Sequence, residues 1–330
     1  MLKVIEEHSR IKEAQVELKE NLGKYSEITG RITIGGTGWH SRHAVSWSEK
    51  LGIWWTTYSL SNRYENAFGV EEPRWNTRYG HSIPSVIDVP FHGINRRIGG
   101  VFAVDENNKL YLLHRGRIGG GRKGIGKTLF LANYRGKWVA VQDGDSVSRL
   151  ALVAILNSEK FPWQIANFVH ELQRIKQEDI VGTKPSVTLT DTFEEEFSGT
   201  KEYVVGKVEA ECDHGLVVSS LEKKLRTEGL IVGNRYPMDL YVLDADGEMV
   251  TLFEVKTDSS SASCYEAIGQ LLFYSARLDR KPQIVAVFPH PFDREYGDVF
   301  DKIGIQRLTY TWKDNQPEFD NSQIANLRIK

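Results

Sequence analysis

The stretch Met238-Asp239-Leu-Tyr-Val-Leu-Asp-Ala-Asp-Gly-Glu-Met-Val-Thr-Leu-Phe-Glu254-Val-Lys256-Thr257 decides the fold of the C-terminal part of this 330-residue chain. Residues 250–257 predict a strand, because apolar and polar side chains alternate along it. Residues 244–247 read Asp-Ala-Asp-Gly and have the turn chemistry of a hairpin. We therefore expect residues 238–243 to pair antiparallel with the strand that follows the turn.

This hairpin brings three functional side chains to one end of a sheet. Alternation places Phe253 and Val255 on one face of the strand and Glu254 and Lys256 on the other. Pairing of the two strands returns Asp239 to the neighbourhood of Glu254 and Lys256. Two carboxylates suit a hard divalent cation that keeps some of its waters, and a lysine beside them can orient one of those waters. The pattern predicts a site for metal-assisted hydrolysis.

Asp239, fourteen intervening residues and then Glu254-Val-Lys256 resemble the motif of the PD-(D/E)xK nuclease superfamily. Residues 265–274 predict a helix after the strand, and its Gln270 and Tyr274 share a face because they are four residues apart. This pair is similar to the Q-x3-Y motif of the RecB-like and phage-exonuclease-like branch. The resemblance implies that Asp239 and Glu254 bind Mg²⁺, which Mn²⁺ can replace. It also implies that Lys256 positions the attacking water and that Gln270 and Tyr274 orient the site.

The order of the predicted elements extends the resemblance over residues 205–330. We expect residues 214–229 to form an amphipathic helix closed by a glycine, and residues 283–288 to form a buried strand. Helix, three strands, helix and strand is the core order of the superfamily. Its first helix often contributes a histidine or an acid to the site.

The sequence departs from the family pattern at two points. The motif of the superfamily places a proline directly before the aspartate, whereas here Met238 separates Pro237 from Asp239. Asp239 is therefore expected to act as the first motif acid without an adjacent proline. The acid of the first helix is ambiguous between Glu211 and Glu222, and the resemblance favours His214 as a further catalytic residue. A solvated surface histidine is the alternative for His214.

Composition and charge distribution bound the remaining expectations. A chain of this length predicts two domains. Residues 31–150 contain 17 Lys and Arg against 9 Asp and Glu, whereas the rest of the chain contains 25 against 35. A basic part joined to an acidic part fits a nucleic-acid reader joined to a carboxylate-bearing metal site. With two cysteines and no long apolar run, we expect no disulfide framework and a cytoplasmic location.

We expect a mixed α+β or α/β protein with four parts. These are an N-terminal helix over residues 1–30, a β-rich, barrel-like recognition domain over 31–180, a linker over 181–204 and the mixed-sheet nuclease domain over 205–330. Within the first part, residues 3–22 carry a thin apolar stripe. Short β-prone runs separated by turns predict the barrel or a strongly bent sheet.

The expected recognition domain combines arginines with many aromatic residues. Basic groups neutralise phosphates, and exposed aromatic rings stack on bases. Burial in the barrel core is the alternative for the tryptophans among them, Trp39, Trp47, Trp54, Trp55 and Trp75. The predicted nucleic-acid contacts are Arg42, Arg74, Arg78, Arg115, Arg117, Arg122, Lys123 and Lys127.

Residues 121–128 satisfy the P-loop pattern G-x4-G-K-T. A P-loop requires a long helix whose N-terminus faces the phosphates, and residues 129–136 are too few before the next β-prone run. We interpret the segment as a glycine-rich basic loop whose amides approach a nucleic-acid phosphate. A merely flexible surface loop is the alternative.

These expectations converge on a Mg²⁺-dependent deoxyribonuclease. A reader domain ahead of the nuclease indicates an endonuclease of the restriction or defence type, with a modified base as one target. DNA is the expected partner, no membrane is involved, and a homodimer is one option. The alternatives are a DNA-binding protein that uses the nuclease fold as a scaffold, and an NTP-driven enzyme that uses residues 121–128.

Overall fold

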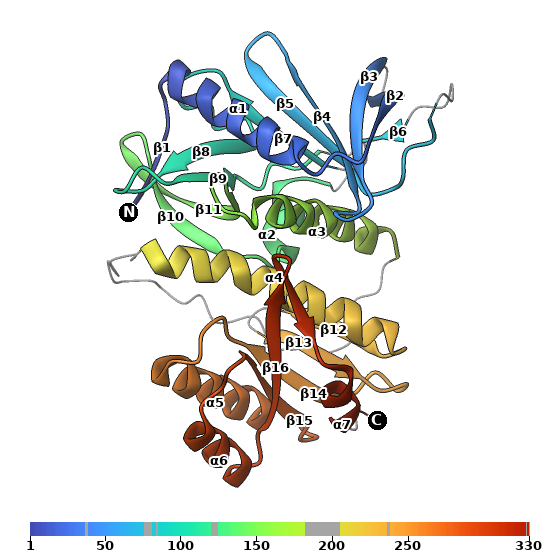
Figure 1. Cartoon of the computed structure of the whole chain (residues 1–330), viewed down its shortest axis with the longest axis vertical. Helices are drawn as coiled ribbons and strands as arrows, with labels where there is room; N and C mark the ends of the chain where they lie inside the picture. The colour runs from blue at the N-terminus through green and yellow to red at the C-terminus, as the bar shows by residue number, and fades with distance from the viewer. Residues whose placement is uncertain are drawn as a thin grey trace. The chain divides into compact units, whose positions relative to one another are not determined.

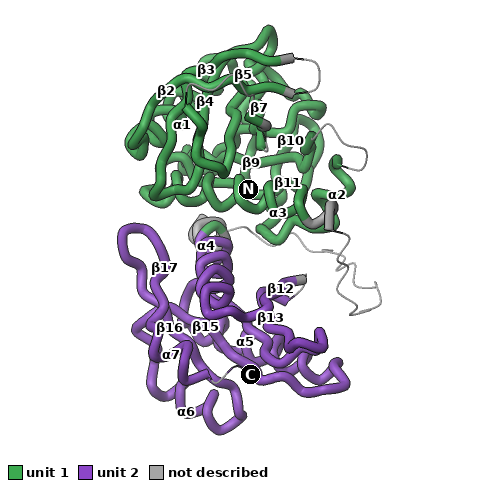
Figure 2. Tube along the Cα trace, turned by 90° about the vertical axis from the view of Figure 1, so that its right-hand side faces the viewer, with its two compact units in different colours: residues 1–183, 202–212 green, residues 184–201, 213–330 purple. Residues whose placement is uncertain are grey.

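The computed structural model describes residues 1–36, 39–75, 81–83, 85–119, 125–181, 205–235, 238–327 and 329. The chain divides into two compact units (Figure 2). Unit 1 consists of residues 1–183 and 202–212, and unit 2 of residues 184–201 and 213–330. Within the described residues, both units are mixed α+β, as the sequence predicts.

Unit 1 contains a closed five-stranded barrel. Its strands in spatial order are β1 (Leu2–Val4), β10 (Trp138–Asp143), β11 (Ser146–Ile155), β9 (Leu110–His114) and β8 (Gly100–Val104). The short β1 closes it, because β1 pairs in parallel with β10 and antiparallel with β8. The N-terminal helix, which is expected within residues 1–30, therefore begins only at His8, and residues 2–4 are a strand of the barrel.

A second sheet of six strands completes the β-structure of unit 1. Its order is β6 (His81–Ser82), β2 (Ile28–Gly36), β3 (Trp39–Ser48), β4 (Ile53–Ser59), β5 (Arg63–Gly69) and β7 (Ser85–Pro90). The helix α1 (His8–Gly23) packs on this sheet, where Gln15 Nε2 donates to Asn66 Oδ1 at 2.7 Å. The longer helix α3 (Phe161–Val181) contacts β7 and β11, and the short helix α2 (Lys127–Asn133) contacts α3.

Most of the described tryptophans of the six-stranded sheet belong to the core. Trp47, Trp54 and Trp55 are buried, and Trp54 and Trp47 join an apolar cluster that Trp75 also contacts. Trp75 packs so closely over Gly30 that an added Cβ would lie 2.5 Å from its ring. The core alternative is thus correct for the three buried tryptophans, which cannot stack on bases.

Unit 2 is built on one six-stranded sheet. Its order is β12 (Ile231–Arg235), β13 (Met238–Leu243), β14 (Met249–Val255), β15 (Gln283–Pro289), β16 (Gln306–Lys313) and β17 (Gln316–Phe319). The predicted hairpin is confirmed, since β13 and β14 pair antiparallel with Leu240 opposite Phe253. The neighbours of β15 are both parallel to it.

Helices cover both faces of this sheet (Figure 1). One face carries α4 (Val205–Thr227) and α7 (Asn321–Asn326), whose residues Leu221 and Ile324 share a buried cluster with Phe253. The other face carries α5 (Ser261–Ala276) and α6 (Arg294–Lys302), with Leu271 and Phe300 buried against it. The order α4, β12, β13, β14, α5, β15 is the order of elements expected from the sequence.

The boundary between the units lies inside α4, between Cys212 and Asp213, rather than at residue 204. The predicted helix over 214–229 begins earlier, at Val205, and Gly229 follows its end with φ +82°. Residues 182–204, which make up nearly all of the expected linker, lie outside the described residues. Both cysteines are free.

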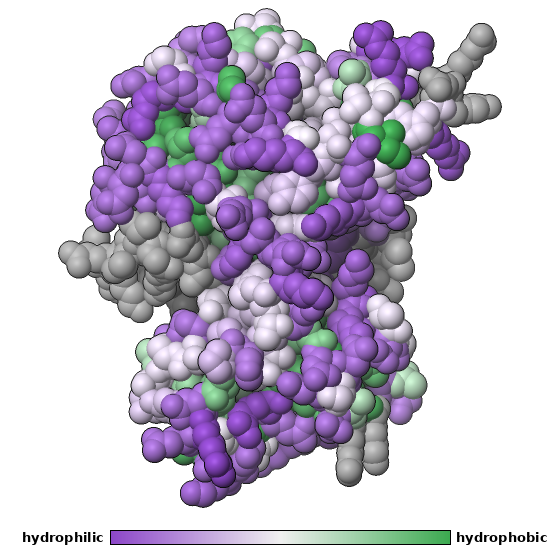
Figure 3. All heavy atoms as spheres, in the orientation of Figure 1, coloured by the Kyte–Doolittle hydropathy of each residue, from purple (hydrophilic) through white to green (hydrophobic). Residues whose placement is uncertain are grey.

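Hydrophilic side chains cover most of the face seen in Figure 3. None of the helices in the described ranges is long and apolar enough to cross a membrane.

Candidate active site

The hairpin of β13 and β14 positions the carboxylate of Asp239. The turn between the strands is fixed by Asp244, whose Oδ1 accepts hydrogen bonds from the amides of Asp246 at 3.1 Å and Glu248 at 2.9 Å. Gly247 supplies the positive φ of +84° that this turn requires. The resulting register lets Asp239 Oδ2 accept a hydrogen bond from the amide of Val255 at 2.9 Å. A local turn thus sets Asp239 beside the residues flanking Val255.

Lys256 is the centre of the polar cluster. Its Nζ donates to Glu254 Oε1 at 2.9 Å and to Gln270 Oε1 at 2.6 Å. The side chain of Lys256 is only 13% exposed and that of Glu254 only 4%. Charges that are this deeply buried are costly unless they are paired, so the cluster is a specific arrangement rather than a surface contact.

The backbone of Lys256 is held as firmly as its side chain. Its amide donates to the carbonyl of Val287 on β15 at 2.8 Å, and its carbonyl accepts from the hydroxyl of Tyr310 on β16 at 3.3 Å. Burial raises the pKa of Tyr310 well above its usual value, so this hydroxyl stays protonated and keeps donating. Because its backbone is fixed, the side chain of Lys256 projects from the end of β14 in one defined direction.

His214 joins the cluster from α4. Its Nε2 lies 3.1 Å from Asp239 Oδ2, and both side chains are largely buried, at 13% and 14% exposed. The predicted site residues thus form two contact groups near the end of β14. His214 contacts Asp239, which also accepts from the Val255 amide, and Lys256 contacts both Glu254 and Gln270. The alternative that His214 is a solvated surface histidine is therefore wrong.

The two candidate acids of the first helix differ from His214. Glu222 forms an ion pair with Arg226 one turn further along α4, at 2.9 Å. The side chain of Glu211 lies outside the described residues.

Tyr274, the sixth predicted residue, lies in the apolar layer beneath α5. It packs against the buried cluster that contains Tyr241, Met249 and Leu252, and its ring contacts Phe273 edge-on at 5.7 Å. Gln270 and Tyr274 share α5 with the predicted spacing, and Gln270 is the one that contacts Lys256 in the hydrogen bonds described above.

Glu266 is a site residue that sequence reasoning missed. Its Oε2 lies 3.7 Å from Lys256 Nζ, and its side chain is 70% exposed. It precedes Gln270 by four residues and so shares its helix face, which is the signal that could have identified it. Tyr310 had no such signal, because it lies 54 residues after Lys256.

The donor set fits a hard cation with few protein ligands. Asp239 and Glu254 supply carboxylate oxygens, which Mg²⁺ and Mn²⁺ prefer. Within the described ranges, no group of three or more His, Cys, Asp or Glu is arranged to hold a metal. Mg²⁺ typically takes one or two carboxylates and completes its shell with water and phosphate oxygens, so a two-carboxylate site is sufficient for it.

The predicted nucleic-acid contacts in unit 1 divide into three groups. Arg115 is buried, 6% exposed, and makes two hydrogen bonds to Asp143, at 2.6 and 2.8 Å. The prediction that Arg115 contacts phosphate is therefore wrong, because its donors face Asp143. Four others are exposed: Arg42, Arg74, Arg117 and Lys127. The remaining three, Arg78, Arg122 and Lys123, lie outside the described residues.

The segment that matches the P-loop pattern ends in a short helix. Lys127 is the first residue of α2, which has seven residues, and β10 follows soon after it. This agrees with the expectation that too few residues follow Thr128 for a P-loop helix.

Comparisons with protein-family models, with curated proteins and with solved structures found no match to this chain.

Proposed function

We propose that unit 2 is a divalent-metal-dependent nuclease that hydrolyses phosphodiester bonds of DNA. The observation that carries this proposal is the contact of Lys256 with both Glu254 and Gln270, with Asp239 held on the amide of the intervening Val255 in the same mixed sheet. The order of elements around them is also that of the PD-(D/E)xK superfamily, which the sequence resembles.

Asp239 and Glu254 would hold the cation. A bound Mg²⁺ would neutralise charge at the scissile phosphate and lower the pKa of a coordinated water. The bond from the Val255 amide and the contact with His214 fix the carboxylate of Asp239, so its orientation is set before any ligand arrives.

Lys256 would orient the attacking water. Its ammonium group has three N–H donors, and Glu254 and Gln270 take two of them. Glu266, at 3.7 Å, is beyond hydrogen-bond distance. Within the described residues, one donor therefore remains for a water or a phosphate oxygen, and the other two bonds determine where it points.

The test is cleavage of plasmid DNA, with and without modified bases, by the full chain in Mg²⁺ and in EDTA. We expect Mg²⁺-dependent cleavage that Asp239→Asn and Lys256→Ala abolish, while both variants bind DNA with nearly wild-type affinity. Lys224→Ala is the matched control, because Lys224 forms a partly exposed ion pair with Glu228 on α4. Wild-type cleavage rates in Lys256→Ala would refute the proposal, and DNA binding without cleavage by the wild type would favour a scaffold.

A further inference from the structure

Two arginine-bearing turns lie at one end of the barrel in unit 1. Residues 95–99 precede β8, and residues 115–118 follow β9. Since β8 and β9 pair antiparallel with Gly100 opposite His114, both turns leave the barrel at the same end.

Two hydrogen bonds connect these turns. The amide of Arg115 donates to the carbonyl of Gly99 at 2.7 Å, and Arg117 Nε donates to the carbonyl of Arg96. A Cβ at Gly99 would lie 2.6 Å from His114 Nε2 and 3.2 Å from the carbonyl oxygen of Arg117. Glycine is thus required for the turns to approach this closely.

Each turn is also rigid by itself. In the first turn, Asn95 Oδ1 accepts from the amide of Arg97 at 3.0 Å, and the next residue, Ile98, is buried. In the second, Gly116 has φ +74°, and a Cβ there would lie 2.7 Å from the ring of Phe130. The exposed side chains of Arg97 and Arg117 therefore extend from backbone that packing and hydrogen bonds hold in place.

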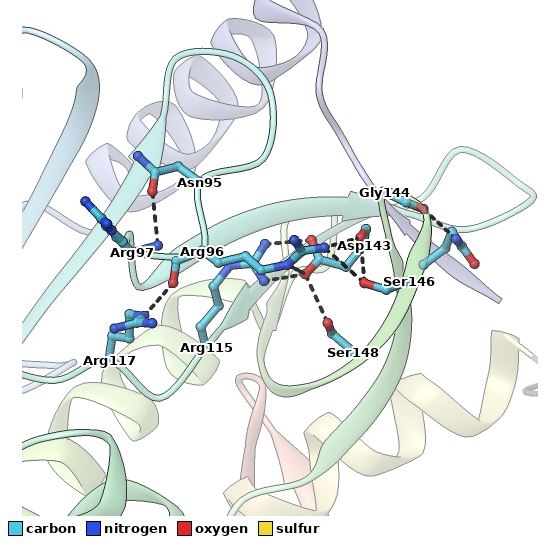
Figure 4. A network of polar contacts seen from close by, with 10 residues as sticks. Asn95, Arg96, Arg97, Arg115, Arg117, Asp143, Gly144, Ser146 and Ser148 are labelled. Carbon is cyan, nitrogen blue, oxygen red and sulfur yellow. Dashed lines mark hydrogen bonds and ion pairs between the residues drawn. The ribbon is translucent and has the colours of Figure 1, made fainter.

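Asp143 organises the guanidinium groups around it (Figure 4). Arg115 takes both of its carboxylate oxygens, and Ser148 Oγ donates to Oδ2 at 3.0 Å. Arg96 donates from Nε to the same carboxylate at 3.1 Å and from Nη2 to the Asp143 carbonyl at 2.8 Å. The aspartate thereby aligns one buried arginine and one exposed arginine.

The cluster carries an excess of positive charge. Arg96 and Arg115 share the single carboxylate of Asp143. Together with Arg97 and Arg117 on the same two turns, the cluster has four guanidinium groups and one carboxylate, which leaves three positive charges. In the part of the chain that the structure describes, no carboxylate pairs with Arg97 or Arg117. The guanidinium group of Arg97 and the two Nη atoms of Arg117 are therefore available to an external anion.

We propose that Arg96, Arg97 and Arg117 form a phosphate-binding patch for the backbone of a nucleic acid. The guanidinium group matches phosphate geometry and donates in pairs, and pre-ordered turns reduce the entropy lost on binding. The choice of nucleic acid among polyanions rests on the function proposed for unit 2. Arg96 and Arg97 are additions to the predicted contacts, and Asp143 and Arg115 are positioning residues beneath them.

The test measures binding of the full chain to a short fluorescein-labelled DNA duplex in EDTA, which prevents cleavage. We compare the wild type, Arg97→Gln, Arg117→Gln, the double variant and Arg149→Gln. Arg149 is a matched control because it is an exposed arginine of unit 1 that lies over the ring of Trp138. Each lost phosphate contact should weaken binding about tenfold at roughly 0.1 M salt and reduce the salt slope by about one unit.

We expect both effects in each single variant, their combination in the double variant and wild-type binding in Arg149→Gln. An equal loss in Arg149→Gln would show that only net charge matters and would overturn the proposal. Failure of the wild type to bind the duplex at low salt would also overturn the proposal. So would displacement of the labelled duplex by inorganic phosphate at a concentration equal to that of the duplex phosphates. Binding without cleavage in Mg²⁺ contradicts only the function proposed for unit 2, so the two failures are distinguishable.

Discussion

Replacing Lys256 by methionine removes the cation that faces the buried carboxylate of Glu254. The two groups are 2.9 Å apart, and the Glu254 side chain is 4% exposed, so water cannot replace the lost partner efficiently. Breaking a buried pair from one side costs about 3–5 kcal/mol, because a buried carboxylate loses the opposite charge that lies closest to it. We expect Lys256→Met to lower the free energy of unfolding of unit 2 by about 3 kcal/mol in EDTA.

A double-mutant cycle isolates the interaction between the two charges. Glu254→Gln with Lys256→Met removes both charges and the desolvation cost of an isolated one, so the double variant should be more stable than the sum of the single variants predicts. We expect a coupling energy of about 2 kcal/mol. Hydrogen exchange of the β13 and β14 amides under increasing urea measures it for unit 2 alone.

Lys224→Met is the control for this cycle. Lys224 and Glu228 are 3.7 Å apart, with side chains 28% and 52% exposed, and exposed pairs of this kind contribute less than about 1 kcal/mol. A coupling between Glu254 and Lys256 no larger than that of this exposed pair would refute the reasoning, since the two charges would then be hydrated. Addition of Mg²⁺ should stabilise the wild type but not Glu254→Gln, because that variant lacks one of the two carboxylates.

Three further predictions concern the positioning residues and the basic loop. Gln270→Ala removes the 2.6 Å bond to Lys256, and loss of such a supporting partner should lower kcat for cleavage about 10- to 100-fold with little change in KM, in steady-state kinetics. The hydrogen bonds from Arg115 lower the pKa of Asp143 to about 2, below its unfolded value, so this contribution is present above about pH 4 and is lost as pH falls through 2. Urea unfolding at pH 7 and at low pH should show about 2 kcal/mol of pH-dependent stability that Asp143→Asn lacks. Wild type should show no saturable ATP binding by equilibrium dialysis, because α2 has only seven residues, whereas Lys127→Ala should weaken binding to all DNA sequences about equally and reduce the salt slope by about one unit.

Local patterns predicted much of unit 2. The turn at residues 244–247, the alternation around Glu254 and the spacing of Gln270 on its helix involve residues close together in sequence. The conformation of this turn and the faces on which these side chains lie depend on backbone sterics and on strand or helix periodicity, which act over a few residues. For this reason the hairpin pairing agrees with the prediction, and Lys256 contacts Glu254 and Gln270.

The partners of charged and aromatic side chains in unit 1 were decided by the tertiary structure. Arg115 and the exposed Arg117 lie in the same short basic segment, so the local sequence does not distinguish them. The partner of Arg115, Asp143, lies 28 residues further along the chain at the end of β10. Trp54 and Trp55 are adjacent on a strand and would point to opposite faces, yet both are buried, and Trp54 joins the apolar cluster of the six-stranded sheet. Burial on each face depends on what packs there, and the local sequence carries no information about that.

The same limit explains the differences at the ends of elements. Residues 2–4 form a strand because Leu2 meets Val141 across the closing edge of the barrel, although the sequence around them is helix-forming. Pairing with strands distant in sequence satisfies the backbone groups of this segment and overrides its weak helical preference. The sequence by itself therefore determined the hairpin and the helix spacing that hold the candidate active site, because these depend on neighbouring residues. Only the tertiary structure decided which arginines face solvent and how the barrel closes, because those outcomes depend on contacts between residues far apart in the chain.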